Sequence, residues 1–593
     1  MYSQSRVSNK ETRGLDVDTY VPTRLDTRLR EDILKSKYRL VIITGNAGDG
    51  KTAFIQKIED ELFNEKQIVI TKRDNGSTFS IDGHKFETNY DGSQDDNDLQ
   101  NEEVLDTFFE YLSGDKINFD AIDICKIIAI NEGKLLDFLF KSPKKEKYRH
   151  LQAIVEDQHI LHKYDDNLPI ILINLNYRSI VDGELDDLTG DNLFEKILTE
   201  FSRQDHWKDC NACPCKLQCH VKFNVDTMNH PQHGVAVKKG LKTLFQILHL
   251  RKVQHITIRD LRSALSYILF NMYTCEEIAS NADDPTFFLS KVYYNSVYDL
   301  PNNIFNERDR ILILLNKLDP GVNSNPKEDN RLSTNFFHDI NSEDEERKDY
   351  FWKYDGRSEY EEEILKSYFE SRPQSYLTEY LKTHPTERMN EAIYFLSVKR
   401  KYYFEGIFPT KEDRMKLLPY RALMKFIASI RGDVNLTETR KELVEAISVS
   451  ERIYNRKYKR DYLMIRTSDN IDMRIKSFYR FPSAEFMVNP KILNKNLERY
   501  IENSSNELEL IYGKDQSKKL AINLDLYELL VRIKQGYIPS QSEIRGLFLN
   551  LYMFKRIMSS DKEHKDQIFL TKNDDEFFSI SKLNAGKFVF RSE

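Results

Sequence analysis

The chain has 593 residues, of which 40% are hydrophobic and 31% are charged, a composition typical of soluble globular proteins. This length predicts roughly three or four domains. The formal net charge of −7 excludes a general attraction to nucleic acid, so a DNA or RNA site would need a local basic face. No apolar run approaches the roughly 18 residues of a membrane span, and the polar N-terminus does not resemble a signal peptide. We therefore expect a cytoplasmic protein without a membrane partner.

The N-terminal third alternates short apolar segments with amphipathic ones, after a polar arm. Buried strands separated by helices predict a parallel sheet that helices cover on both faces. Gly83 marks the turn of a hairpin that follows the second strand. The expected strands are 40–44, 67–71, 126–130 and 169–175, and the expected helices are 51–63, 102–112 and one that begins near residue 131.

The string GNAGDGKT, residues 45–52, joins the first predicted strand to the first predicted helix. It fits G-x-x-x-x-G-K-[ST], the P-loop pattern whose backbone N–H groups cradle phosphate. Its glycines let the backbone curl where side chains would collide with the ligand, and the helix start adds positive potential. We expect Lys51 to reach the outer phosphates and Thr52 to bind Mg²⁺. The predicted nucleotide-binding residues are Gly45, Asn46, Ala47, Gly48, Asp49, Gly50, Lys51, Thr52 and Ala53.

A P-loop hydrolase needs an acid on a neighbouring strand, but the usual four apolar residues followed by Asp-Glu are absent here. Two candidates take that place. Asn131 and Glu132 follow one predicted strand, where Glu132 could act as the base, and Asp91 ends a strand-like run. Each acid also fits a structural role, Glu132 at a helix start and Asp91 in a turn. The sequence leaves the choice between them open.

Polar residues also follow the strand at 169–175. Asn174 and Asn176 lie at its end, and Arg178 comes just after them. Side chains at such a strand end could contact the γ-phosphate, in this chain or in a neighbouring one. A solvated loop would carry the same residues.

A later helix, predicted over 257–270, begins with a capping signature formed by Thr257 and Asp260. Arg262 shares a polar stripe with Arg259 and Ser266 on this helix. An arginine placed there could close on the nucleotide as part of a lid. An ordinary surface helix would look the same.

Four of the six cysteines fall within ten residues, in WKDCNACPCKLQCH. This clustering argues against a disulfide framework. The spacing predicts a structural Zn²⁺ ion that staples an irregular insertion, with an iron–sulfur cluster or unligated thiols as alternatives. The predicted ligands are Cys210, Cys213, Cys215 and Cys219, and His220, His230 or His233 could replace Cys215 as the fourth ligand.

Three stretches mix Lys and Arg with Tyr, at 141–150, 398–404 and 452–462. Such segments suit contact with a nucleic-acid backbone, although charged helix faces are commoner. The expected organisation is an N-terminal arm (1–30), a P-loop core (31–200), a cysteine-rich insertion (201–235), a helical lid (236–320), a linker (321–357), a helical domain (358–465) and a mixed α+β domain (466–593).

Over residues 35–275 the chain resembles the large P-loop ATPases of bacterial anti-phage systems, such as the ATPase of DNA-phosphorothioation-dependent restriction and the BREX ATPases. The resemblance rests on GNAGDGKT, YDGSQDD, IAINEGKLLDFL, INLNYRSIV, the C-x2-C-x5-C pattern before FNVDT, and HITIRDLRSAL, which occur in that order. It implies an AAA+ or STAND-like α/β ATPase in which Asp91 and Asn131 lie near the nucleotide. The missing Asp-Glu pair and the lack of a clear arginine finger depart from the AAA+ pattern.

The expected function is therefore ATP binding and hydrolysis, as a motor or switch, in a bacterial defence or DNA-restriction system. The implied cofactors are ATP, Mg²⁺ and Zn²⁺. The implied partners are other defence proteins, DNA and further copies of this chain. A STAND-like scaffold with slow turnover is the main alternative, and a small-substrate kinase fits less well because the C-terminal half is long and largely helical.

Overall fold

The structure, a computed structural model, divides the chain into two compact units. The first unit comprises Met1–Gln246, Gln254–Ile407 and Leu493–Ser504, and the second comprises Ile247–Val253, Phe408–Ile492 and Ser505–Glu593. The residues described are 20–592 without 96–99, 160–162, 182–191, 253–254, 300–309, 331, 333–358, 371–384, 407, 409, 455–459, 468–473, 492–494, 504, 514–517, 561–566, 573–575 and 583–586.

Some of the predicted segments fall outside the described residues. These are residues 1–19 of the arm, 333–357 of the linker and 455–459 of the third basic stretch.

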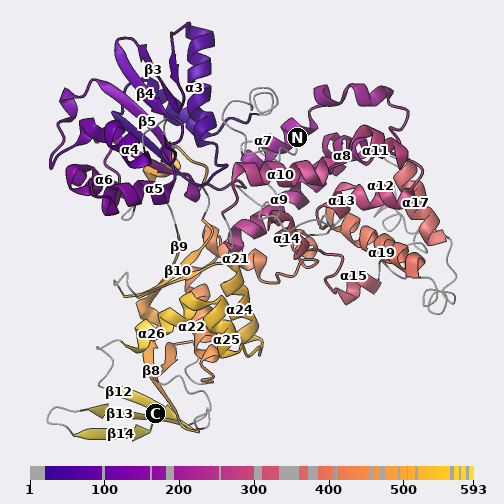
Figure 1. Cartoon of the computed structure of the whole chain (residues 1–593). Coiled ribbons are helices and arrows are strands. Elements are labelled where there is room, and N and C mark those ends of the chain that lie inside the picture. Colours follow the sequence, from indigo (N-terminus) through magenta and orange to yellow (C-terminus); the bar gives the residue numbers. More distant parts are fainter. Residues whose placement is uncertain are drawn as a thin grey trace. The chain divides into compact units, whose positions relative to one another are not determined.

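A six-stranded sheet of order β2-β3-β4-β5-β1-β6 forms the centre of the first unit (Figure 1). Strands β4, β5, β1 and β6 are parallel to one another, whereas β3 pairs antiparallel with β4 and with the edge strand β2. The parallel part confirms the expected α/β architecture. The strands are β1 (Leu40–Thr44), β2 (Thr71–Arg73), β3 (Gly76–Ile81), β4 (His84–Asn89), β5 (Ile124–Ile130) and β6 (Ile170–Asn174).

The expected strand over 67–71 is wrong, and the expected parallel sheet is mixed, because two antiparallel strands extend one edge. Gln67 adopts a left-handed conformation with φ of 52° and ends the preceding helix. Strand β2 starts only at Thr71, and Val69 is 81% exposed. Ile68 and Ile70 are only partly buried against the sheet core, and β-branched residues alone do not make a segment pair as a strand. The hairpin turn at Gly83 is confirmed, with Ile81 and His84 paired across it.

Helices cover the two faces of the parallel strands, as alternation along those strands requires. Val41 and Ile43 of β1 pack with residues of α3 (Lys51–Lys66), η1 (Leu25–Leu29) and α2 (Arg30–Leu34). Leu40 and Ile42 face the opposite way, into a core shared with α4 (Asn101–Phe109) and α6 (Arg149–His159). Helix α3 and the pair α4 and α6 are seen on opposite sides of the strands in Figure 1. The result is a three-layer α/β arrangement.

The rest of the first unit is helical. Helix α10 begins with the predicted capping box, in which Thr257 and Asp260 exchange hydrogen bonds. The short α23 (Lys495–Glu498) comes from far along the chain and adds Leu497 to the sheet core. The other helices are α5 (Glu132–Leu136), η4 (Asp137–Lys141), α7 (Leu193–Ser202), η7 (Gln204–Trp207), η8 (Asp209–Ala212), α8 (His220–Asn229), α9 (His233–Arg251), which continues into the second unit, α10 (Ile258–Phe270), α11 (Cys275–Ser280), α12 (Pro285–Lys291), α13 (Tyr293–Ser296), α14 (Arg310–Asn316), α15 (Pro326–Asn330), α17 (Glu359–Glu370) and α19 (Pro385–Glu405).

The second unit combines helices with two antiparallel sheets of order β11-β10-β9 and β14-β13-β12-β8-β7. Among the described helices of the chain, none combines the length and apolar character that a membrane span requires. The helices are α20 (Lys411–Met415), α21 (Leu423–Arg431), α22 (Leu436–Ser450), α24 (Leu524–Lys534), α25 (Gln541–Leu547) and α26 (Leu549–Ser559). The strands are β7 (Tyr462–Arg466), β8 (Lys476–Pro482), β9 (Phe486–Pro490), β10 (Leu508–Tyr512), β11 (Lys519–Ile522), β12 (Gln567–Thr571), β13 (Phe577–Lys582) and β14 (Phe588–Ser592).

A buried carboxylate ties α3 to the hairpin strands. Glu59, which is 1% exposed, accepts hydrogen bonds from the hydroxyls of Ser77, Thr88 and Tyr90 at 2.6, 2.8 and 2.5 Å. Three donors compensate the loss of hydration that a buried carboxylate suffers. This network fixes the position of Tyr90 at the end of β4.

Replacing Glu59 by Gln should destabilise the sheet unit by about 1–3 kcal/mol. The amide NH₂ group that replaces one carboxylate oxygen cannot accept a hydrogen bond from a hydroxyl. Hydrogen exchange of the α3 amides, measured by mass spectrometry, would report the loss as faster exchange. Asp60→Asn is the matched control, since the Asp60 side chain is 61% exposed one residue further along the same helix. Equal protection in both variants would contradict the prediction.

Candidate functional site

The segment that follows β1, residues 45–52, is termed the glycine loop. Gly45, Gly48 and Gly50 have φ angles of 148°, 100° and 83°, which side chains rarely allow. A Cβ atom on Gly48 would lie 2.8 Å from the Cβ of Arg259, so the loop also needs glycine for close packing against α10. The predicted strand–loop–helix context is present.

Lys51 and Thr52 both point back toward the ends of the parallel strands. The Lys51 ammonium donates to the carbonyl oxygens of Gly45 and Asn46, both at 2.8 Å. The Thr52 hydroxyl donates to the carbonyl of Tyr90 at 2.8 Å. Gly50, the N-cap of α3, provides no side-chain hydrogen bond to the first helical turn. The start of this 16-residue helix thus presents N–H groups and a positive dipole end to the loop.

Asp49 braces the glycine loop from behind. It is 1% exposed, accepts from the Asn46 N–H at 2.7 Å and lies 3.0 Å from Nε2 of His255. Its carbonyl accepts from Arg178 at 2.9 Å, and Arg178 is 3.1 Å from Glu502. Arg178 is predicted from the sequence to contact phosphate. In the structure it is only 3% exposed, and it supports the loop through the Asp49 carbonyl. The sequence gives no spacing signal for His255 or Glu502, because both come from distant segments.

Asp91 is one of two carboxylates, with Asp49, whose charges act on Lys51. Burial lowers the pKa of Lys51 and the charge of Arg259 lowers it further, whereas the charges of Asp49 and Asp91 oppose that shift. Asp91 itself is positioned by the N–H of Ser93 at 2.9 Å and by the Gln94 amide at 2.8 Å. It therefore lies at the strand edge beside Thr52, which binds the carbonyl of the preceding residue.

Glu132 lies at the end of β5, the strand next to β1, and three side chains hold its carboxylate. His159 is 3.0 Å away, and the amides of Asn176 and Asn174 donate to it at 2.5 and 3.3 Å. The hydrogen bond from His159 is the largest influence, and together these donors keep the pKa of Glu132 below its usual value despite partial burial. Asn131 is exposed and caps α5 by accepting from the Gly133 N–H.

Two arginines of α10 lie in different surroundings. Arg259 is exposed, contacts Gly48 and acts electrostatically on Lys51. Arg262 lies one turn further along, 5.7 Å above the ring of Phe201. Ser266 is buried. The structure thus brings Arg259 to the glycine loop, whereas Arg262 packs over the ring of Phe201.

The four clustered cysteines are free thiols and partly exposed. No cluster of three or more His, Cys, Asp or Glu side chains within the described residues is arranged to hold a metal ion. Burial raises the pKa of the Cys210 thiol, and the thiols of Cys275 and Cys213 contribute to the shift. Burial likewise raises the pKa of Cys219.

The histidines predicted as alternative ligands have other surroundings. Burial lowers the pKa of His220 to about 4, and its ring packs at 5.8 Å against Phe287. Nδ1 of His233 lies 2.9 Å from Glu405, and the His230 ring is 4.9 Å from the His233 ring. None of these contacts is with a cysteine.

The basic stretch 398–404 lies inside the helical part of the first unit. Lys399, Arg400 and Lys401 form ion pairs with Asp329, Asp319 and Glu361 at 2.7, 2.5 and 2.6 Å. Each of the three cationic side chains is at most 15% exposed. These charges stabilise the fold rather than form a nucleic-acid surface. In the stretch 141–150, Lys144 and Lys147 pair with Asp106 at 3.1 and 3.0 Å.

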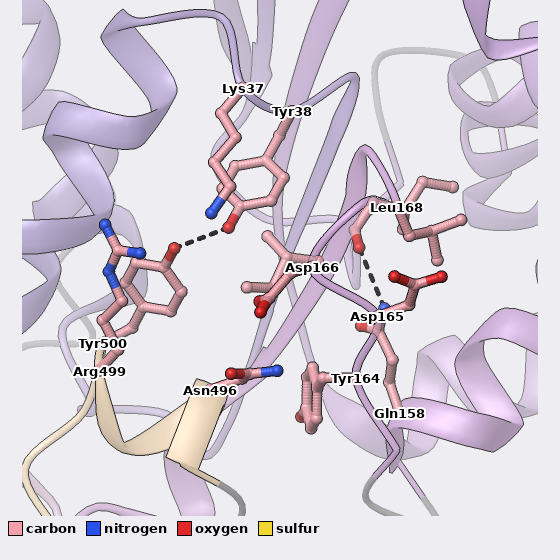
Figure 2. Close-up of a pocket in the computed structure, with 12 residues that line it drawn as sticks. Lys37, Tyr38, Gln158, Tyr164, Asp165, Asp166, Leu168, Asn496, Arg499 and Tyr500 are labelled. Carbon is pink, nitrogen blue, oxygen red and sulfur yellow. Dashed lines mark hydrogen bonds between the residues drawn. The ribbon is translucent and has the colours of Figure 1, made fainter.

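A pocket of about 340 Å³ lies elsewhere on the sheet unit, near the starts of β1 and β6 (Figure 2). Tyr38 and Tyr500 share a hydrogen bond of 2.7 Å at its wall, and Arg499 and Asp166 also line it. The glycine loop follows the carboxyl end of β1, so this pocket lies at the opposite, amino-terminal end of the parallel strands. Open parallel sheets bind ligands beyond their carboxyl ends, which favours the glycine loop as the candidate site.

Neither family models nor curated proteins nor solved structures match this chain. The function must therefore be argued from the site itself.

Replacing Glu132 by Gln should lower stability by about 1 kcal/mol at pH 7, since the charged acceptor of three hydrogen bonds is lost. Because the folded-state pKa lies below the ordinary value of 4.5, the carboxylate stabilises the protein fully above pH 4.5 and loses its effect as the pH falls through the folded-state pKa. The difference in thermal midpoint between variant and wild type should thus shrink from pH 7 to pH 3.5. Glu103→Gln, at an exposed position of α4, is the control, and a difference that does not vary with pH would refute this assignment.

Proposed function

We propose that the chain binds and hydrolyses ATP at the glycine loop, as the P-loop NTPase component of a bacterial anti-phage defence or DNA-restriction system. The observation that carries the proposal is the convergence of two cations, Lys51 and Arg259, on a loop with three left-handed glycines. Two like charges held close together repel each other, which disfavours the charged form of each group. A bound polyphosphate would relieve that repulsion.

The phosphate-binding part of the proposal rests on residues 45–53. The loop glycines leave room for close approach, and the uncapped start of α3 supplies N–H groups and a positive dipole end. Lys51 now donates to two carbonyls of its own loop, from which it could turn to the outer phosphates.

Thr52 and Asp91 are the residues that would hold Mg²⁺. A hydroxyl and a carboxylate are oxygen ligands of the kind this ion prefers, and the two come from adjoining positions at the carboxyl edge of the sheet. When bound, the ion neutralises the charge that develops on the phosphates. The fit of these donors supports Asp91, over Glu132, as the metal-binding acid.

Glu132 would act on the attacking water. The amides of Asn174 and Asn176 and the ring of His159 orient its carboxylate, which stays ionised at neutral pH. An ionised, oriented carboxylate can align water and accept its proton. Asn131, one residue earlier and exposed, would be the second polar side chain near the nucleotide at this strand end.

The lowered pKa of Glu132 also supports the alternative, a STAND-like scaffold that retains ATP and rarely hydrolyses it. A carboxylate with a lowered pKa is a weaker base, since the ideal catalytic pKa lies near the working pH. The proposed partners, which are other defence proteins, DNA and further copies of this chain, rest on the sequence resemblance alone.

Lys51→Ala should weaken ATP binding at least tenfold, or about 1.4 kcal/mol, because the loop loses the ammonium that would bind the outer phosphates. Titration of a fluorescent ATP analogue, with and without Mg²⁺, would measure the affinity. Lys66→Ala, at the exposed far end of the same helix, should bind like the wild type. Asp91→Asn should lose the part of the affinity that depends on Mg²⁺ and keep the part measured in EDTA.

Steady-state turnover with and without DNA separates the two forms of the proposal. Fast hydrolysis that Glu132→Gln abolishes supports the motor or switch. ATP that stays bound through purification, with turnover below detection in wild type, supports the scaffold. Equal ATP affinity in wild type, Lys51→Ala and Lys66→Ala would contradict both forms of the proposal.

Arg259→Ala should raise the Kd for ATP about tenfold, whereas Arg262→Ala should change it less than twofold. The reason is that Arg259 touches the glycine loop and acts on Lys51, while Arg262 stacks on Phe201. The two variants remove the same charge from the same helix, so each controls for the other. A larger effect of Arg262→Ala in the same titration would reverse the assignment.

A further inference from the structure

One face of the neighbouring strands β12, β13 and β14 presents phenylalanine rings to water, and we term it the phenylalanine face. Figure 1 shows these strands side by side near the C-terminal end of the chain. Phe578, Phe588 and Phe590 are 43%, 61% and 71% exposed. Ile580 pairs with Phe590 and Phe578 pairs with Ser592, so alternation along the strands places all three rings on the same face. An antiparallel sheet usually turns polar side chains toward water, which makes this face unusual.

The opposite face of these strands belongs to the protein core. Phe569 of β12 and Phe577 of β13 are 4% and 6% exposed and pack with Phe478 and Met464. Ser579, two residues after Phe577, is also buried. The strands therefore have a core on one side, and the rings of the phenylalanine face lie outside it. Contiguous apolar surface of this kind marks a binding site.

Positive charge accompanies the phenylalanine face, although the whole chain has a formal net charge of −7. The described residues 567–572, 576–582 and 587–592 contain four cations and one carboxylate, which gives a local net charge of +3. Lys582 is exposed and lies directly opposite Phe588 on the same face. The face therefore complements an anionic partner. The other charged residues of these strands and their ends are Lys572, Lys587, Arg591 and Glu576, all of which are exposed.

A second copy of this chain matches the face poorly. Strand β14 is the edge of its sheet, and pairing two copies along it would bring Lys587 and Arg591 of both chains together. Like charges brought close in this way repel each other. A partner that combines flat rings with negative charge fits better, because aromatic side chains stack on any nucleobase and cations bind the phosphates.

We propose that the phenylalanine face binds single-stranded nucleic acid, with bases stacked on the exposed rings and phosphates held by Lys582 and the cations of β14. Phe588 and Phe590 lie two residues apart on one strand, so their backbones are about 7 Å apart. This is about twice the spacing of stacked bases, and bases must unstack from one another to rest on both rings. A duplex keeps its bases stacked inside and cannot bind in this way.

This site does not depend on the glycine loop. Only its use in defence rests on the proposed function, in which nucleic acid is one of the partners. The two proposals can therefore fail separately.

Fluorescence anisotropy of labelled oligothymidylate and oligouridylate tests the proposal with the full-length protein in the absence of ATP. Wild type should bind one or both single strands at least tenfold more tightly than a duplex of equal length, and Phe590→Ala should raise the Kd for the strand about tenfold. The stronger of the two identifies the nucleic acid as DNA or RNA, because only RNA carries the 2′-hydroxyl.

Phe63→Ala is the matched control for this titration and should bind like the wild type. Phe63 is 61% exposed but lies on α3 in the first unit. An unchanged Kd in Phe590→Ala, or equal affinity for the single strand and the duplex, would overturn the proposal.

Further substitutions separate stacking and charge from general apolar contact. Phe590→Trp should keep the affinity and Phe590→Leu should lose it, because leucine preserves the apolar surface but has no ring on which a base can stack. Lys582→Ala should reduce the slope of log Kd against log salt concentration by about 0.7. A dimer seen by light scattering and retained by Phe590→Leu would show that a second copy covers the face, and the proposal would be wrong.

Photocross-linking of the wild type avoids any folding defect of the variants. A single strand that contains iodouracil should cross-link to peptides that include Phe578, Phe588 or Phe590, as identified by mass spectrometry. Cross-links confined to the basic stretch 141–150 would place the nucleic acid elsewhere and contradict the assignment. None of these measurements requires ATP, so a failure of the nucleotide proposal would leave their results unchanged.

Discussion

A single buried carboxylate, Asp49, holds the glycine loop in its conformation. Its oxygens bind the Asn46 N–H and His255, and its carbonyl receives the buried guanidinium of Arg178, which in turn lies against Glu502. These partners come from four regions of the sequence, so the loop adopts its shape only when the first unit has folded. Removing one partner would leave a buried charge unpaired and lower the free energy of unfolding. These contacts therefore stabilise the loop only when all of them are present.

The strand order determines what surrounds that loop. Because β4, β5, β1 and β6 run parallel, their carboxyl ends bring Asp91, Glu132 and Asn174 to one edge. Strand β5 separates β4 from β1, so Asp91 reaches the loop across one strand and beside Thr52. Polar side chains dispersed over the sequence thereby become a single site with acids in different environments.

Much of the fold could be predicted from local pattern. Continuous apolar runs identified β1, β5 and β6, and the capping signature at Thr257 identified the start of α10, because each depends on neighbouring residues alone. The expected strand at 67–71 failed because Val69 is exposed and Ile68 and Ile70 are only partly buried against the sheet core, so the apolar run alone did not decide the local structure. Arg178 illustrates the same limit at the site, since an arginine after a strand reads as a phosphate contact although here the fold buries it.

The sequence by itself predicted the conformation of the glycine loop and led to the proposal that it binds phosphate, because glycine, lysine and threonine at that spacing act through backbone geometry and short-range charge. It also showed that a cysteine cluster exists. Only the tertiary structure decided that Arg259, rather than Arg262, meets the loop. This depends on how α10 packs, and packing between distant segments leaves no fixed spacing in the sequence.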